Sequence, residues 1–199
     1  MSPLDFICHF YPDDNPLRRL LIIHSQKVYD KAMDILIHAR CIDPVPFAAI
    51  DEDLVYWGAM LHDIGIGRTH APSIFCEGTE PYICHGTIGA EMLREIGPTV
   101  NGQQTTVDTT ALARICERHT GAGLTVADIE QQNLPITPAR DLLPETLEER
   151  LICLADKFYS KSGDPTAEKS IDRVQRSMMK FGTDSMTRFD ALCKTFFVK

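Results

Sequence analysis

Apolar residues recur at helical spacing in one segment after another of this sequence, and this periodicity limits the fold more than any other feature. The clearest segment follows Asn15-Pro16, where an N-capping residue precedes a proline at the first helical position. Apolar residues then recur every three or four positions, which predicts one long amphipathic helix over 17–40. The apolar positions are Leu17, Leu20, Leu21, Val28, Ala32, Ile35 and Ala39.

Further helical patterns follow, separated by segments that contain proline and glycine. Thr125 and Asp128 form a capping-box pattern that predicts a short helix. Residues 66–84 contain glycines and prolines and are expected to form a long loop, a type of segment that is often functional. We find no convincing strand. The other helices are expected at 51–65, 85–95, 108–119, 144–160, 166–181 and 184–198, so the predicted fold class is all-α, a single helical bundle of about seven helices.

Length and composition exclude several classes of protein. The 199 residues are 44% hydrophobic and 24% charged, as expected for one globular domain. No apolar run approaches the ~20 residues of a membrane-spanning helix, and residues 1–14 lack the features of a secretory signal. We therefore expect a cytoplasmic protein with no membrane partner. The formal charge of −8 disfavours a nucleic-acid partner, which would need clustered lysine and arginine.

Six side chains that can bind metal fall at or near inward-facing helical positions. His24 lies on the apolar stripe of the long helix, and His119 lies on that of helix 108–119. One histidine on an apolar face is more often a core residue than a ligand. Four histidines with two carboxylates, however, form the ligand set expected for iron, manganese, cobalt or zinc, and a dication offsets the cost of burying carboxylates. The six are His24, His62, Asp63, His85, His119 and Asp156.

These residues carry a family resemblance. His24, followed by His62-Asp63-Ile64-Gly65 and then by Asp156, resembles the H…HD…D signature of the HD superfamily of metal-dependent phosphohydrolases, in its HDIG form. The added His85 and His119 resemble the six-ligand pattern of members that hold two metals. The resemblance implies a single HD-type domain over 1–199, with a core at about 17–160 and C-terminal helices at 166–198.

The resemblance also implies a division of labour within the site. His24, His62, Asp63 and Asp156 would hold the first metal, Asp63 would bridge to the second, and His85 and His119 would complete the second. The cofactors would be two divalent ions, with iron or manganese favoured and zinc, cobalt, nickel or magnesium as alternatives. A metal-bound hydroxide would then attack a phosphoryl group.

Basic residues near the signature are candidates for contacting phosphate. Arg68 lies five residues after Asp63, where related proteins place a basic residue facing the phosphate, although here Ile66 follows Gly65 in place of a lysine. Arg68 is therefore predicted to be catalytic with Asp63 and to bind substrate, since an arginine fork suits phosphate oxygens. Lys157 and Lys161 are further substrate-binding candidates; an exposed, solvated side chain is the alternative for all three.

The predicted function is hydrolysis of a phosphomonoester or phosphodiester bond in a small phosphorylated substrate. A nucleotide is favoured by family analogy, because no glycine-rich phosphate loop or base-binding feature is evident in the sequence. Two alternatives stay open. An HD-fold di-iron oxygenase would have nearly the same ligands, and a non-catalytic nucleotide-binding sensor would bind without turnover. The oligomeric state is not predicted.

Overall fold

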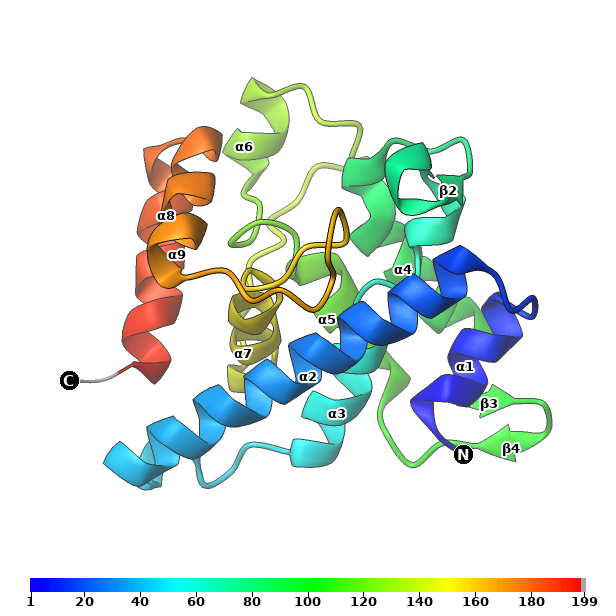
Figure 1. Ribbon diagram of the computed structural model, residues 1–199, viewed down its shortest axis with the longest axis horizontal. Coiled ribbons are helices and arrows are strands. Elements are labelled where there is room, and N and C mark those ends of the chain that lie inside the picture. Colours follow the sequence, from blue (N-terminus) through cyan, green and yellow to red (C-terminus); the bar gives the residue numbers. More distant parts are fainter. Residues whose placement is uncertain (198–199) are drawn as a thin grey trace.

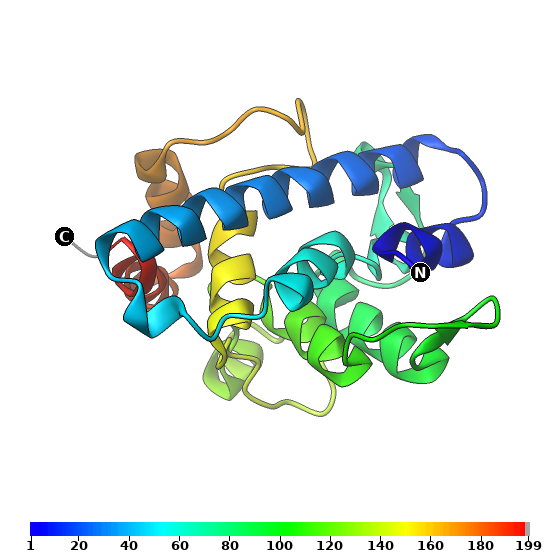
Figure 2. The same cartoon turned by 90° about the horizontal axis from the view of Figure 1, so that it is seen from below.

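The longest helix, α2 (Pro16–Ile42), crosses one face of the molecule, and most of the other helices pack against it or beneath it (Figures 1 and 2). The structure is a computed structural model that describes residues 1–197. Asn15 caps α2 by accepting a hydrogen bond from the main-chain N–H of Arg18, and Pro16 takes the first helical position, as predicted. The buried stripe of α2 includes His24, which therefore faces the interior.

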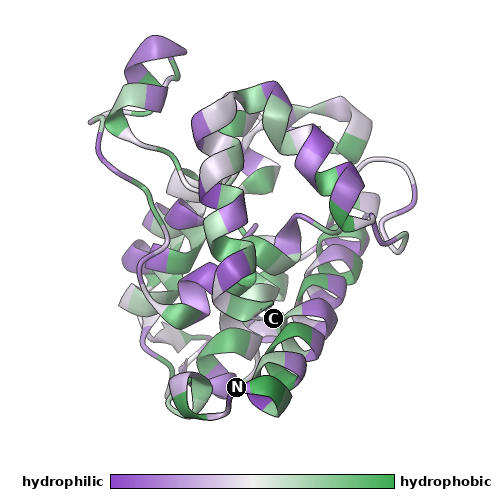
Figure 3. Cartoon of the chain, turned by 90° about the vertical axis from the view of Figure 1, so that its left-hand side faces the viewer, coloured by the Kyte–Doolittle hydropathy of each residue, from purple (hydrophilic) through white to green (hydrophobic). Residues whose placement is uncertain are grey.

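The fold is all-α, as predicted, with nine α-helices among residues 1–197. Figure 3 shows hydrophilic and hydrophobic residues interleaved along these helices, so each can bury one face. The capping box at Thr125 begins the predicted short helix α6, which projects at the top of Figure 1. Besides α2, the helices are α1 (Pro3–Phe10), α3 (Glu52–Leu61), α4 (His85–Ile96), α5 (Thr109–Arg118), α6 (Val126–Gln131), α7 (Leu147–Asp156), α8 (Ile171–Met178) and α9 (Thr183–Phe196).

Several predicted boundaries were wrong. The helix expected at 144–160 begins only at Leu147, after a capping box on Thr146, and ends at Asp156. The helix expected at 166–181 begins at Ile171 and tightens into a 3₁₀ turn, η5 (Met179–Phe181). Of the helix expected at 184–198, Val198 lies outside the described residues. Helix α1 was not predicted.

The segment 66–84, expected to be a loop, consists of short structured turns. It contains the 3₁₀ turns η2 (Ile66–Arg68), η3 (Pro72–Ile74) and η4 (Tyr82–Cys84), and a small antiparallel ladder in which His70 pairs with Glu77. The expectation of no strand was wrong on this small scale, because two-residue strands are too short to show alternation. The strands are β1 (His70–Ala71), β2 (Cys76–Glu77), β3 (Thr99–Val100) and β4 (Gln103–Gln104).

Two apolar clusters form the main core and meet along α2. One joins α1, the first half of α2, α3, α4 and α5, and it includes Leu21. The other joins the second half of α2 to α7, α8 and α9, and it includes Val28. His24 lies between Leu21 and Val28 on the same stripe, so it stands where the two clusters meet. No helix within residues 1–197 has the length and hydrophobicity that crossing a bilayer requires.

Candidate metal centre

The six predicted ligands converge, and all six side chains are buried. Five of them come from helix ends. His62 caps the C-terminus of α3 and is followed by Asp63, His85 is the first residue of α4, His119 caps the C-terminus of α5, and Asp156 is the last residue of α7. Only His24 comes from the middle of a helix. Side chains at helix ends can project beyond the main chain, and here they project toward one point.

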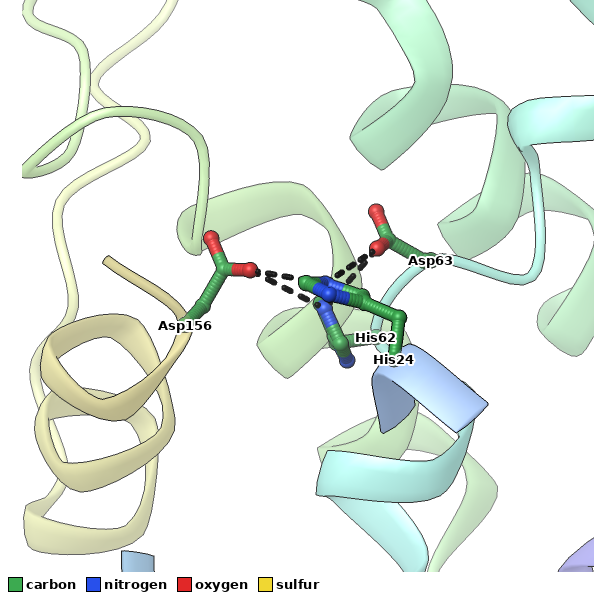
Figure 4. A group of neighbouring side chains, drawn as sticks. All are labelled: His24, His62, Asp63 and Asp156. Atoms are coloured by element: carbon green, nitrogen blue, oxygen red, sulfur yellow. Dashed lines mark hydrogen bonds and ion pairs between the residues drawn. The ribbon is translucent and has the colours of Figure 1, made fainter. Parts of the chain in front are cut away.

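The first group of ligands contains His24, His62, Asp63 and Asp156, with the two imidazoles between the two carboxylates (Figure 4). Nε2 of His24 lies 3.2 Å from Oδ2 of Asp63 and 3.1 Å from Oδ1 of Asp156. Nε2 of His62 lies 3.0 Å and 3.5 Å from the same two oxygens. One ligand atom of each residue thus faces a common centre.

The second group contains Asp63, His85 and His119. Nε2 of each of these histidines lies 3.4 Å from Oδ1 of Asp63, the oxygen that does not face the first group. Within each group, the ligand atoms lie within 4.8 Å of one another. Asp63 therefore offers one oxygen to each group, which is the arrangement of a carboxylate that can bridge two cations.

Three of the imidazoles are held by main-chain carbonyls three residues earlier. Nδ1 of His62, of His85 and of His119 each lies 2.7 Å from such an oxygen, which belongs to Ala59, Tyr82 and Cys116 respectively. Because a carbonyl only accepts, each Nδ1 carries a proton, and Nε2 is the ring nitrogen that can bind a metal.

The contact between His85 and His119 also calls for a cation. Their Nε2 atoms lie 3.0 Å apart, and both carry a free lone pair if Nδ1 is protonated in each ring. Two acceptors at this distance repel each other unless a proton or a metal lies between them. Oδ1 of Asp63 is likewise buried and accepts no hydrogen bond from the described residues. Such unmet acceptors favour a bound cation.

The charges of the site suit a cation too. Burial raises the pKa of Asp63, but the charges of His62 and Lys161 outweigh burial and hold this pKa well below its usual value. Burial lowers the pKa of His62, but Asp63 and Asp156 outweigh burial and raise it to about 9, so a metal that binds Nε2 of His62 must displace a proton. Burial likewise opposes ionisation of Asp156, yet nearby lysine charges keep its pKa well below the usual value. At His85, burial dominates and lowers the pKa to about 3. The carboxylates therefore stay ionised and His85 stays neutral near pH 7, as metal ligands must.

Two of the three predicted substrate-binding residues lie at the centre. Nζ of Lys161 is 2.7 Å from Oδ2 of Asp63, and Nζ of Lys157 is 2.6 Å from Oδ2 of Asp156. Both lysines line a pocket of about 670 Å³, which also reaches His85, His119 and Asp156. They thus stand between the ligand cluster and the pocket.

Arg68 is not brought to this site. Its side chain is exposed and is not among the residues that line the pocket. The main chain turns away in η2, and the carbonyl of Arg68 is tied to the N–H groups of Thr79 and Glu80, at 3.2 Å and 3.1 Å. The geometry therefore gives no support to its predicted contact with phosphate.

Two pocket residues were missed by sequence reasoning. Lys169 lies beyond the HD signature, and its Nζ donates to the carbonyls of Lys157 and Tyr159 at 3.1 Å and 2.6 Å. Tyr82 stacks on the ring of His85, with centroids 4.7 Å apart. No spacing or motif in the sequence marked either residue, because Lys169 lies in an irregular segment and Tyr82 in a single 3₁₀ turn.

The chain is similar in sequence to a known domain family and to several known proteins. The model of the HD domain family matches residues 21–160. An uncharacterized protein of Methanocaldococcus jannaschii is 40% identical over 109 residues, which are 55% of this chain and 50% of that protein. A tRNA (cytidine(56)-2'-O)-methyltransferase of Picrophilus torridus is 35% identical over 156 residues, 78% of this chain and 36% of that protein.

Each of these relatives is longer than its segment that aligns with this chain. A second tRNA (cytidine(56)-2'-O)-methyltransferase, from Thermoplasma volcanium, is 26% identical over 145 residues, 73% of this chain and 36% of that protein. The chain thus spans between about a third and a half of the length of these relatives. No solved structure matched the chain.

Proposed function

Because this chain belongs to the HD domain family, we propose that it is a metal-dependent phosphohydrolase. The observation that carries the proposal is the position of Asp63, with one oxygen toward His24 and His62 and the other toward His85 and His119. This arrangement fits two divalent ions that share one carboxylate. The histidine-rich ligand set favours iron or manganese over magnesium.

A bound metal pair would supply a water-derived nucleophile and neutralise charge on the phosphoryl group. The protein's own residues have three tasks. The main-chain carbonyls behind His62, His85 and His119 fix the ring orientations. Asp63 contributes one oxygen to each group of ligands and so links the two groups. Burial of the cluster excludes bulk water and strengthens each charge interaction.

Lys157 and Lys161 support a phosphorylated substrate. Each pairs with a carboxylate of the cluster, and each lines the pocket. When cations neutralise those carboxylates, the ammonium groups are free to contact phosphate oxygens, which they attract as compact point charges. The pocket volume of about 670 Å³ suits a small molecule such as a nucleotide. We therefore propose a nucleotide phosphoester as substrate.

The named activity of two relatives does not lead to a different proposal. The aligned residues make up 36% of each tRNA methyltransferase, and in this chain the HD match lies mostly within them. We propose that methyl transfer belongs to the part of those relatives without a counterpart here. The lysines beside the cluster also favour an anionic substrate that carries phosphate.

The test is phosphate or nucleoside release from a panel of mono-, di-, cyclic and dinucleotides, with manganese or ferrous iron supplied. Asp63→Asn keeps the side-chain shape but removes the charge, and it is expected to abolish release. Asp34→Asn, at an exposed position of α2, is the matched control and is expected to keep full activity. Absence of release from a folded, metal-loaded protein on every substrate would overturn the proposal in favour of the oxygenase or sensor.

A further inference from the structure

One wall of the pocket is built by residues beyond the HD family match. The match ends at residue 160, but α8, η5 and α9 all contribute to the pocket lining. In Figure 1 these elements stand on one side of the molecule, away from α4 and with α7 between them. The ligand cluster and this wall thus come from different parts of the chain.

Part of this wall is an apolar face of one helix, beside the polar Ser177, Ser185 and Arg188. Val174, Met178 and Phe181 are spaced i, i+4 and i+7 along α8 and the η5 turn that continues it, so they share one side. Val174 and Met178 are buried at 1% and 5% exposure, whereas Phe181 keeps 57%. The deeper residues thus belong to the core, and Phe181 offers an aromatic ring at the rim of the pocket.

The wall is fixed in position by an ion pair. Nη2 of Arg188 on α9 lies 2.7 Å from Oδ2 of Asp128 on α6, and both residues line the pocket. Asp128 is itself held by the main-chain N–H and the hydroxyl of Thr125, both at 2.8 Å. A partly buried, multiply bonded pair of this kind keeps a wall in place better than an exposed one does.

The pocket lining combines basic residues beside the ligand cluster with apolar residues from several elements. Lys157 and Lys161 lie beside the ligand cluster, whereas Ile83, Leu124 and Leu134 line the pocket from segments other than the C-terminal helices. These three side chains are only half-buried, so they leave apolar surface available to a ligand. A molecule with an anionic end and a flat apolar end matches this distribution.

We propose that Phe181 selects phosphate esters whose alcohol portion carries a flat aromatic ring, because that ring stacks on the Phe181 side chain, and that Val174 and Met178 anchor this face in the core. The proposal rests on the proposed function and goes beyond it, because it assigns substrate choice to residues outside the HD match. It commits to esters of nucleoside size over sugar or glycerol phosphates.

The experiment uses two substrates that differ in the presence of an aromatic base. A nucleoside 5'-monophosphate and ribose 5-phosphate share the sugar and the phosphate, so the ratio of their kcat/KM values isolates the contribution of the base. Base–aromatic stacking supports an effect of about tenfold on replacing the aromatic residue by alanine. Phe181→Ala should therefore lower kcat/KM for the nucleotide about tenfold, mainly through KM, and leave ribose 5-phosphate unchanged.

The chain offers a matched control in the same turn. Met179 is 52% exposed, close to the 57% of Phe181, but it does not line the pocket. Met179→Ala is expected to leave both substrates unchanged, and Phe181→Tyr is expected to keep the preference for the nucleotide. Equal behaviour of Phe181→Ala and Met179→Ala on the nucleotide would overturn the proposal.

A binding measurement separates this proposal from the proposed function. Calorimetric titration with the unphosphorylated nucleoside needs no turnover, and Phe181→Ala should weaken binding about tenfold relative to Met179→Ala. If binding depends on Phe181 but no ester releases phosphate, the stacking role of Phe181 stands and the proposed hydrolase activity is overturned. If both substrates release phosphate and Phe181 has no effect, the hydrolase activity stands and the stacking role of Phe181 is overturned.

Discussion

At the scale of single residues, the two oxygens of Asp63 define two half-sites that can be emptied separately. We expect His85→Ala to lose the metal of the second half-site and His24→Ala to weaken the first, whereas Asp63→Asn should lose both. Elemental analysis of the purified proteins gives the number of metals per chain. A His85→Ala variant that holds as much metal as the unaltered protein would contradict the second half-site.

Lys161 competes with metal for Asp63, because its Nζ lies 2.7 Å from Oδ2. In Lys161→Gln, the metal-free protein should lose about 3–5 kcal/mol of unfolding free energy, since a buried carboxylate is left without its counter-charge. Metal should bind more tightly because the competing cation is gone. Chemical denaturation of the chelator-treated protein and a metal titration test the two parts separately. Weaker metal binding would show that Lys161 supports the metal and does not compete with it.

Gly65 of the HDIG signature is required for a close approach of main chains. A Cβ at this position would lie 2.2 Å from the carbonyl oxygen of His85 and 2.5 Å from the N–H nitrogen of Gly89. Neither atom can move without shifting α4, which carries His85. Gly65→Ala should therefore cost about 1–3 kcal/mol of unfolding free energy and also lower the metal content.

Gly58 provides the comparison for that substitution. It is also buried, but an added Cβ would meet the flexible ends of Ile115 and Ile152, at 2.5 Å and 2.7 Å. These side chains can adjust, so Gly58→Ala should keep its full metal content. Measuring metal content and unfolding together shows whether Gly65 acts through the site. Equal metal content in the two variants would contradict that role.

The ligands were predictable at this scale, and their surroundings were not. His24 falls on an apolar stripe whose period is visible in the sequence, so its inward position followed from the helix alone. Arg68 was placed by its distance from Asp63 along the chain, but that distance spans a 3₁₀ turn that leaves its side chain exposed. Lys169 reaches the pocket from an irregular segment, where no periodicity exists to locate it.

At the scale of elements, α1 closes one end of the core. Phe6 is fully buried, and its ring meets that of Trp57 edge-on, with centroids 5.5 Å apart. Phe6→Ala should cost about 3–5 kcal/mol of unfolding free energy and leave metal content unchanged, because α1 contributes no ligand. Leu4→Ala on the same helix, where Leu4 is 40% exposed, should cost far less. Similar losses in the two variants would contradict the packing role of α1.

Length explains which elements were predictable. Helix α2 has 27 residues and shows its period many times over, whereas α1 has 8 and shows it barely twice. The strands have two residues each, too few for any alternation. The start of α7 was placed too early, at Pro144, whereas the capping box on Thr146 sets the boundary at Leu147.

At the scale of the whole molecule, the ligand cluster joins the two apolar clusters, because His24 lies between Leu21 and Val28. Bound metal should therefore stabilise the entire fold. At a hundredfold excess of free ion over its Kd, one site adds about 2.7 kcal/mol, which raises Tm by about 5–10 °C for a chain of this size. Calorimetry before and after chelation measures the change. An unchanged Tm, with metal removal verified, would contradict this coupling.

The three histidines held by carbonyls three residues earlier have a consequence for how such a site can evolve. The acceptors at Ala59, Tyr82 and Cys116 are main-chain atoms, which every amino acid supplies. A substitution at one of those positions therefore keeps the hydrogen bond to the ring, as long as the local turn survives and the new side chain fits its packed surroundings. The orientation of each imidazole thus depends on a local backbone conformation. The sequence around the unchanged ligands can diversify as long as that conformation is kept.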